Sequence, residues 1–126
     1  MESIFTQDAP DAIGPYCHAM KVGNLVFCSG QTPLHPSTMK LVGATIEEQT
    51  KRALENLFVV LAGINLSPRN VVKTTVYLKQ MSDFQGMNEV YATMFQGHKP
   101  SRTTIAVKQN PLDALIEIEC IAELDV

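Results

Sequence analysis

The chain has 126 residues, of which 45% are hydrophobic and 18% charged, a balance typical of one globular domain and not of a disordered chain. Its net charge is −3 and its Lys and Arg residues are scattered, which excludes the basic cluster of a nucleic-acid-binding surface. No apolar run approaches the roughly 20 residues of a membrane span, and the first residues resemble no signal or mitochondrial presequence. We therefore expect a single domain over residues 1–126, located in the cytoplasm with the nucleus also open, without nucleic-acid or membrane partners.

The first third of the chain predicts short strands. Residues 4–7 fit a short edge strand that Asp8-Ala9-Pro10 ends. Residues 16–22 and 25–29 fit two strands of a hairpin that turns at Gly23-Asn24. Residues 30–43 contain Pro and Gly, so we expect a loop in which a short turn pairing can form.

Residues 45–63 predict the first helix. Thr45 followed by Glu48 matches a capping box, in which Thr45 is the N-cap and Glu48 reaches back. Apolar residues then recur at helical spacing, and Gly63 suits the C-terminal stop.

A second helix is expected to open at Ser82-Asp83 by the same capping logic, and Gly97 and Pro100 should end it. Its apolar stripe repeats at helical spacing and consists of Phe84, Met87, Tyr91, Met94 and Phe95.

Residues 70–79, 102–108 and 115–124 predict three further strands, since they are rich in β-branched and other apolar residues. The fold class is therefore α+β with the order (β)ββαβαββ, and both helices should cover one face of a single sheet. Alternation within 70–79 places Val72, Thr74, Val76 and Leu78 on one face and Val71, Lys73, Thr75 and Tyr77 on the other. This second, semi-apolar face is expected to contact another subunit.

Three charged residues stand out on the last strands. Arg102 follows Pro100-Ser101, and its planar fork fits either a surface ion pair or bidentate binding of a carboxylate. Glu117 and Glu119 share one face of their strand, which is either solvated or presents a carboxylate that positions a water.

Other polar residues give weaker signals. The Tyr16 hydroxyl can reach a ligand or pack as an ordinary aromatic, and Asn88 lies at the margin of an apolar stripe. Exposed amides in Cys28-Ser29-Gly30-Gln31 could receive an anion, although this is no phosphate-binding motif.

The cysteines and histidines predict neither disulfides nor a metal site. An odd count without CxxC spacing indicates buried structural thiols at Cys17, Cys28 and Cys120. The three histidines lack the spacing of metal ligands, so we expect no metal.

Taken together, these segments resemble the Rid (reactive intermediate deaminase, also YjgF) family in order and spacing, from near the N-terminus to residue 122. Residues 16–21 and 98–102 look most like fungal members. The resemblance is carried by Ala12-Ile13-Gly14-Pro15-Tyr16, Cys28-Ser29-Gly30-Gln31, Val71-Val72-Lys73-Thr74-Thr75-Val76, Asp83-Phe84, Met87-Asn88-Glu89-Val90-Tyr91, Pro100-Ser101-Arg102, Ile116-Glu117-Ile118-Glu119 and Ile121-Ala122.

The resemblance implies a chorismate-mutase-like fold and a homotrimer whose sheets close into a central barrel, with clefts between subunits. It implies the activity of a 2-iminobutanoate/2-iminopropanoate deaminase. Such enzymes hydrolyse imines and enamines, released by pyridoxal-phosphate-dependent serine and threonine dehydratases, to 2-keto acids and ammonia. No cofactor is implied, because the imine is already activated.

By the same resemblance, Arg102 would bind the substrate carboxylate, and Glu117 would hold the attacking water or assist proton transfer. Tyr16, Ser29 and Asn88 would line the cleft, and the backbone at Gly30 and Thr104 would contact the ligand.

The chain departs from the family pattern at two places. Thr103-Thr104 stand where Ser or Ala followed by Cys is common, and Asn110-Pro111 stand where Leu-Pro often precedes the last strand. These departures bear on substrate preference. The alternative function is a non-catalytic metabolite-binding or regulatory module of the same fold, and an RNA-cleaving protein is disfavoured by the acidic composition.

Overall fold

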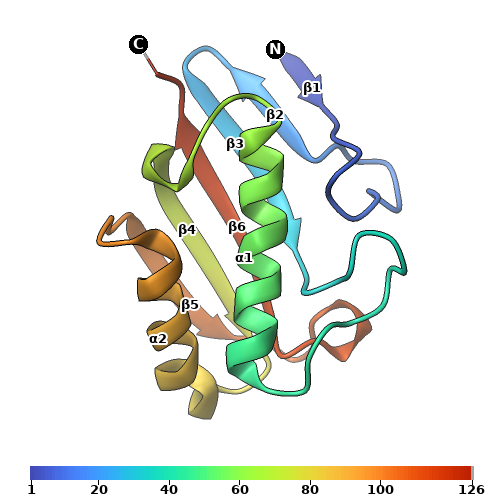
Figure 1. The fold of residues 1–126 in the computed structure, drawn as a ribbon, viewed down its shortest axis with the longest axis vertical. Helices are drawn as coiled ribbons and strands as arrows, with labels where there is room; N and C mark the ends of the chain where they lie inside the picture. The colour runs from blue at the N-terminus through green and yellow to red at the C-terminus, as the bar shows by residue number, and fades with distance from the viewer. Residues whose placement is uncertain (126) are drawn as a thin grey trace.

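The structure is a computed structural model, and it describes residues 1–125. One six-stranded mixed sheet has the order β1-β2-β3-β6-β4-β5, in which β4 and β5 are parallel and the other neighbours antiparallel. Helices α1 and α2 lie side by side across one face of this sheet (Figure 1). The elements are β1 (Glu2–Ile4), β2 (Ala19–Val22), β3 (Leu25–Gln31), α1 (Ile46–Ala62), β4 (Val71–Leu78), α2 (Phe84–Phe95), β5 (Ser101–Ala106) and β6 (Ile116–Glu123).

This arrangement confirms the predicted α+β class, the element order and the placement of both helices on one face. The predicted edge strand is displaced from residues 4–7 to Glu2–Ile4, and β2 begins at Ala19 and not at residue 16. The backbone N–H of Thr6 donates to Nδ1 of His18 at 3.1 Å and not to a strand carbonyl, so strand pairing stops at Ile4. The hairpin turn after Val22 and a short pairing of Leu34 with Leu41 are both present.

Helix α1 begins as the sequence predicts. The Thr45 hydroxyl accepts a hydrogen bond from the Glu48 N–H at 3.1 Å, which satisfies one of the free donors of the first turn. The Glu48 carboxylate reaches back to the Thr45 hydroxyl at 2.9 Å and not to the Thr45 backbone, so only half of the capping box forms as predicted. Gly63 is the C-cap.

The capping prediction for α2 is wrong, although the helix itself is confirmed. A 3₁₀ turn over Met81–Asp83 leads into the helix, and Asp83 already has helical backbone angles. The Asp83 side chain makes no capping hydrogen bond, because the preceding turn replaces the extended N-cap conformation that such a bond requires.

The first residues of β4 lie on the opposite faces from those that simple alternation predicts. The pairing of β4 with β6 shifts register between Val71 and Lys73, which is a β-bulge. Val71 is therefore buried, whereas Val72 is 44% exposed. From Thr74 onward the predicted alternation holds.

The core lies between the helices and the sheet. The largest side chains of α1 that are fully buried are Leu54, Leu57 and Leu61, and they share the core with Ile116 and Ile118 of β6. Each such side chain stabilises the fold by about 1.5–3 kcal/mol relative to an exposed position.

The buried thiols of β3 and β6 face each other. Cys28 and Cys120 are register partners, and contact with the Cys28 thiol, together with burial, raises the pKa of Cys120. Cys17 is only half-buried, which corrects the expectation that all three thiols are buried, because it lies in the loop before β2. Among residues 1–125, no helix has both the length and the apolar character of a membrane span.

The second face of the sheet is uncovered and semi-apolar. Phe27 of β3 and Ile105 of β5 are 44% and 43% exposed. Their register partners on this face are Ile121 and Tyr77. Polar side chains, among them Thr75 and Glu119, lie between them.

Candidate active site

The Arg102 guanidinium lies between the sheet and α2. Arg102 is the register partner of the buried Thr74, so its side chain points to the helix-covered face. The guanidinium carbon lies 4.8 Å from the ring centroid of Tyr91 and 5.5 Å from that of Phe84. Both distances fit cation–π attraction.

Within residues 1–125 no carboxylate forms an ion pair with this guanidinium, since the ion pair that forms there is Lys79–Asp113 at 2.9 Å. The polar contact of Arg102 is a weak one, from Nη1 to the Met87 sulfur at 3.9 Å. A half-buried fork without a counter-ion is suited to an anionic ligand. It lines a cavity of about 470 Å³ with Asn88, Tyr91, Ala92, His98, Lys99 and Pro100.

Glu117 points to the opposite face of the sheet. Its register partner is Tyr77, whereas its neighbours Ile116 and Ile118 are buried under the helices. Its carboxyl group lies against the backbone of Gly30, where a β-bulge interrupts the pairing of β3 and β6. Glu117 lines a second cavity, of about 670 Å³, with Asp11, Ile13, Tyr16, Ser29, Gly30, Thr32, Leu34, Met39, Pro111 and Leu112.

The carboxyl groups on this face influence one another. Burial, and then the negative charge of Glu119, raises the pKa of Glu117 above its ordinary value. Glu119 accepts a hydrogen bond from the Tyr77 hydroxyl, which raises the pKa of Tyr77 to about 12. This rise moves the pKa of Glu117 toward neutral pH, and a carboxyl group whose pKa is nearer to the working pH can both accept and return a proton.

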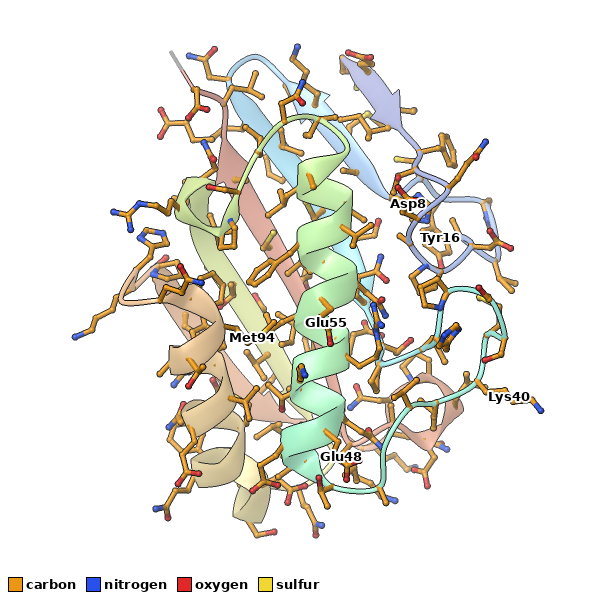
Figure 2. All side chains as sticks on the ribbon, viewed as in Figure 1. Asp8, Tyr16, Lys40, Glu48, Glu55 and Met94 are labelled. Atoms are coloured by element: carbon orange, nitrogen blue, oxygen red, sulfur yellow. The ribbon has the colours of Figure 1, made fainter. Side chains whose placement is uncertain are left out.

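Tyr16 and Ser29 lie beside Glu117 in the second cavity. Tyr16 is 49% exposed, in the loop that precedes β2. The Ser29 hydroxyl donates to the Cys17 carbonyl at 2.8 Å, which leaves its oxygen free to accept a hydrogen bond from a ligand. Figure 2 shows Tyr16 on one side of α1 and Met94 of α2 on the other.

Thr104 lines neither of these two cavities. It shares the helix-covered face with Arg102, two residues along β5. Its hydroxyl is buried and finds no hydrogen-bond partner among residues 1–125.

The structure thus divides the predicted site into two half-sites. The acid half-site contains Tyr16, Ser29, Gly30 and Glu117, and the arginine half-site contains Asn88 and Arg102. The two cavities share no lining residue, and Arg102 and Glu117 point to opposite faces of the sheet. One copy of the chain therefore does not present both groups to one small ligand.

Sequence reasoning missed the apolar wall of the acid half-site. Met39 and Leu112 adopt left-handed backbone conformations, with φ of 58° and 57°. Such strain in residues other than glycine is concentrated at functional sites, but no sequence pattern predicts these two left-handed conformations. The loop that contributes Thr32 and Leu34 to this wall is held by Asn56 of α1, whose amide donates to both carbonyls at 3.1 and 2.8 Å.

The residues that the structure describes contain no group of three or more His, Cys, Asp or Glu side chains placed to hold a metal ion.

The fold is shared with known proteins. A sequence profile of the family described as Endoribonuclease L-PSP matches residues 6–124. The chain belongs to this family, which includes the YjgF and Rid proteins, and the resemblance noted in the sequence is thereby confirmed.

Individual relatives cover nearly the whole chain. A RutC family protein of Pyrococcus abyssi is 50% identical over 96% of this chain and 95% of its own length. A mouse protein named 2-iminobutanoate/2-iminopropanoate deaminase is 44% identical over 94% of this chain and 88% of its own. The crystal structure of Escherichia coli TdcF with bound serine superposes with a TM-score of 0.93 at 37% identity, over 99% of this chain and 100% of that one.

Proposed function

We propose that this protein is a deaminase that hydrolyses 2-iminobutanoate, 2-iminopropanoate and their enamine tautomers to 2-keto acids and ammonia. The observation that carries the proposal is the guanidinium of Arg102, half-buried in a cavity and without a carboxylate partner among residues 1–125. The name of the mouse relative supports the substrate class. Serine, the ligand of the TdcF structure, has an α-carboxylate like that of a 2-imino acid, which supports an arginine anchor.

The reaction needs a positioned water and proton transfers. In its ionised form Glu117 accepts a proton from water as the water oxygen bonds to the C=N carbon, and it passes a proton to the imine nitrogen, which gives a carbinolamine. The same carboxylate then takes the hydroxyl proton of the carbinolamine and delivers it to the amine nitrogen, so that ammonia leaves as the C=O bond forms. The raised pKa of Glu117 suits both steps. Arg102 fixes the carboxylate end of the substrate.

We further propose that the active site is completed between copies of the chain in a homotrimer. The acid half-site of one subunit would face the arginine half-site of its neighbour. This assembly is supported by the placement of Arg102 and Glu117 in separate cavities. It is also supported by the uncovered, semi-apolar face that contains Phe27 and Ile105.

A coupled assay tests the activity. Threonine dehydratase generates the enamine in situ, and keto-acid release is followed with and without this protein. We expect acceleration by the wild type and loss of about 100-fold or more in kcat/KM for Arg102→Ala. Binding of 2-oxobutanoate without any acceleration would instead identify the non-catalytic binding module.

Subunit complementation tests the shared site. Arg102→Ala and Glu117→Ala proteins are each expected to be inactive. Dissociating and reassembling an equal mixture should restore roughly a quarter of the wild-type sites, because each site then draws its two groups at random from neighbouring subunits. An inactive mixture that reassembles into trimers would show that both groups act within one subunit.

A further inference from the structure

We propose that Tyr91 is a positioning residue that holds the Arg102 guanidinium in the orientation that binds a carboxylate, and that Thr74 fixes Tyr91 in turn. The inference rests on the proposed function, since it concerns how the same arginine is held. It assigns a specific role to a side chain that the sequence indicated only as part of the apolar stripe of α2.

Three residues form a closed circuit of contacts. Arg102 and Thr74 are register partners on the parallel strands β5 and β4. The Thr74 and Tyr91 hydroxyls are joined by a hydrogen bond of 2.7 Å. The Tyr91 ring in turn lies under the guanidinium carbon of Arg102 at 4.8 Å. Each member is therefore fixed by the other two, and the circuit links both strands to α2.

Tyr91 is itself rigidly held. It is 8% exposed, and its ring packs against the buried Phe95 with centroids 4.6 Å apart. The Thr74 hydroxyl that it contacts is on a fully buried residue. A ring fixed on its edge by a buried hydrogen bond and on its face by another ring presents a constant surface to the guanidinium.

The cation–π contact with Tyr91 leaves the Arg102 guanidinium available to a ligand. Burial is the main cause that raises the pKa of the Tyr91 phenol, so the ring is neutral at physiological pH and is not a counter-ion. A guanidinium held over an aromatic face keeps its N–H groups directed outward in the plane of the fork, where they can pair with a carboxylate. A carboxylate in place of Tyr91 would orient the arginine equally well but would compete with the substrate.

The Phe84 ring and the Met87 thioether also contact the Arg102 guanidinium. Phe84 lies 5.5 Å from the same guanidinium carbon, and Met87 contacts Nη1 through its sulfur. All of these contacts come from α2, one or two turns apart. Helix α2 therefore supplies an apolar support for the charge, and of these three residues Tyr91 is the one whose side chain also hydrogen-bonds to Thr74 of β4.

The test compares Tyr91→Leu with Tyr91→Phe and a matched control, Phe58→Leu. Phe58 packs on Phe95 at 5.3 Å and belongs to the same core, but it is no part of the cation–π contacts of Arg102. We expect Tyr91→Leu to raise KM and the Kd for 2-oxobutanoate about 5- to 30-fold. Tyr91→Phe keeps the ring and should raise both about 2- to 5-fold. Phe58→Leu should leave KM and the Kd for 2-oxobutanoate within about 2-fold of the wild-type values, although it lowers the Tm of the protein.

A double mutant separates positioning from general structural damage. In the Arg102→Ala background, Tyr91→Leu should weaken binding of 2-oxobutanoate no further, because the group that it positions is gone. An unchanged Kd for Tyr91→Leu in the wild-type background, or an equal additional loss in the Arg102→Ala background, would overturn the proposal. Failure of the proposed function is distinguishable, since the wild type itself would then show no deaminase activity.

If Tyr91→Leu fails to fold, Thr74→Val decides. This substitution removes the hydrogen bond to the Tyr91 hydroxyl and keeps the ring. An increase of about 2- to 5-fold in the Kd for 2-oxobutanoate supports the circuit. A Kd equal to that of the wild type refutes it.

Discussion

Gly30 and Glu117 lie in such close contact that a side chain at position 30 would displace the Glu117 carboxyl group. A Cβ built on Gly30 would come within 2.5 Å of the Glu117 Oε1 atom. The backbone at Gly30 is not in the left-handed region, so the requirement for glycine comes from this contact and not from backbone strain.

We therefore predict that Gly30→Ala displaces the Glu117 carboxyl group from its place in the acid half-site. Deaminase activity should fall by about 10- to 100-fold, since small misplacement of a catalytic group is costly. Gly23→Ala is an instructive comparison, because the space around Gly23 is open but its φ is 58°. That variant should lose stability through backbone strain and retain its kcat. Equal kcat values in the two variants would contradict the assigned role of the contact.

Glu117→Gln is predicted to stabilise the fold at neutral pH while it removes activity. The pKa of Glu117 is raised in the folded state, chiefly by burial, so the folded state favours the protonated form. The contribution of Glu117 to stability is fully present below its pKa in the unfolded chain. It is lost as the pH rises through the raised pKa of Glu117 in the folded state. A neutral amide avoids this loss. Thermal unfolding at pH 5 and pH 8 should show a larger gain in Tm at the higher pH.

Glu119→Gln should shift the acidic limb of the pH–activity profile to lower pH. The charge of Glu119 is the second cause that raises the pKa of Glu117, after burial, and the substitution removes it. Activity that needs ionised Glu117 then persists further into the acidic range. An unchanged limb would show that a different group controls it.

The same variant has a second, spectroscopic readout. The hydrogen bond to Glu119 is the first cause of the raised pKa of Tyr77, so this pKa should fall in Glu119→Gln from about 12 toward its ordinary value. The chain contains three Tyr and no Trp, which leaves the ultraviolet absorbance of tyrosinate unobscured during an alkaline titration.

Asn56→Ala is predicted to destabilise the chain and to loosen the wall of the acid half-site. The Asn56 side chain accepts from Arg52 Nε and Nη2 at 3.1 and 2.7 Å and donates to the carbonyls of Thr32 and Leu34. Its removal leaves buried groups without partners and should lower the free energy of unfolding by about 2–4 kcal/mol in urea titrations. Lys51→Ala, on the exposed side of the same helix, should change it by less than about 0.5 kcal/mol.

Local patterns were sufficient to predict most of the fold. Helical spacing and the Thr45 cap placed α1 to within one residue at each end. The faces of β4 were predicted correctly from Thr74 onward and incorrectly at Val72, because a bulge depends on the partner strand β6 and not on the sequence of β4 alone.

The candidate site was less predictable than the fold. The sequence placed Arg102 and Glu117 on neighbouring late strands, but the sheet inserts β4 between them, and the register sends their side chains to opposite faces. The contact of Tyr91 with Arg102 also depends on the parallel pairing of β4 and β5. Such pairings join residues far apart in the chain, and no local pattern encodes them.

The unequal burial of the cysteines provides a single-site chemical handle. Cys28 and Cys120 are buried against each other, whereas Cys17 is half-buried and its carbonyl accepts the hydrogen bond from Ser29 at the acid half-site. A small thiol-reactive fluorophore added to the native protein should therefore label Cys17 selectively. Its emission would report occupancy of the neighbouring cavity in real time, without an introduced cysteine.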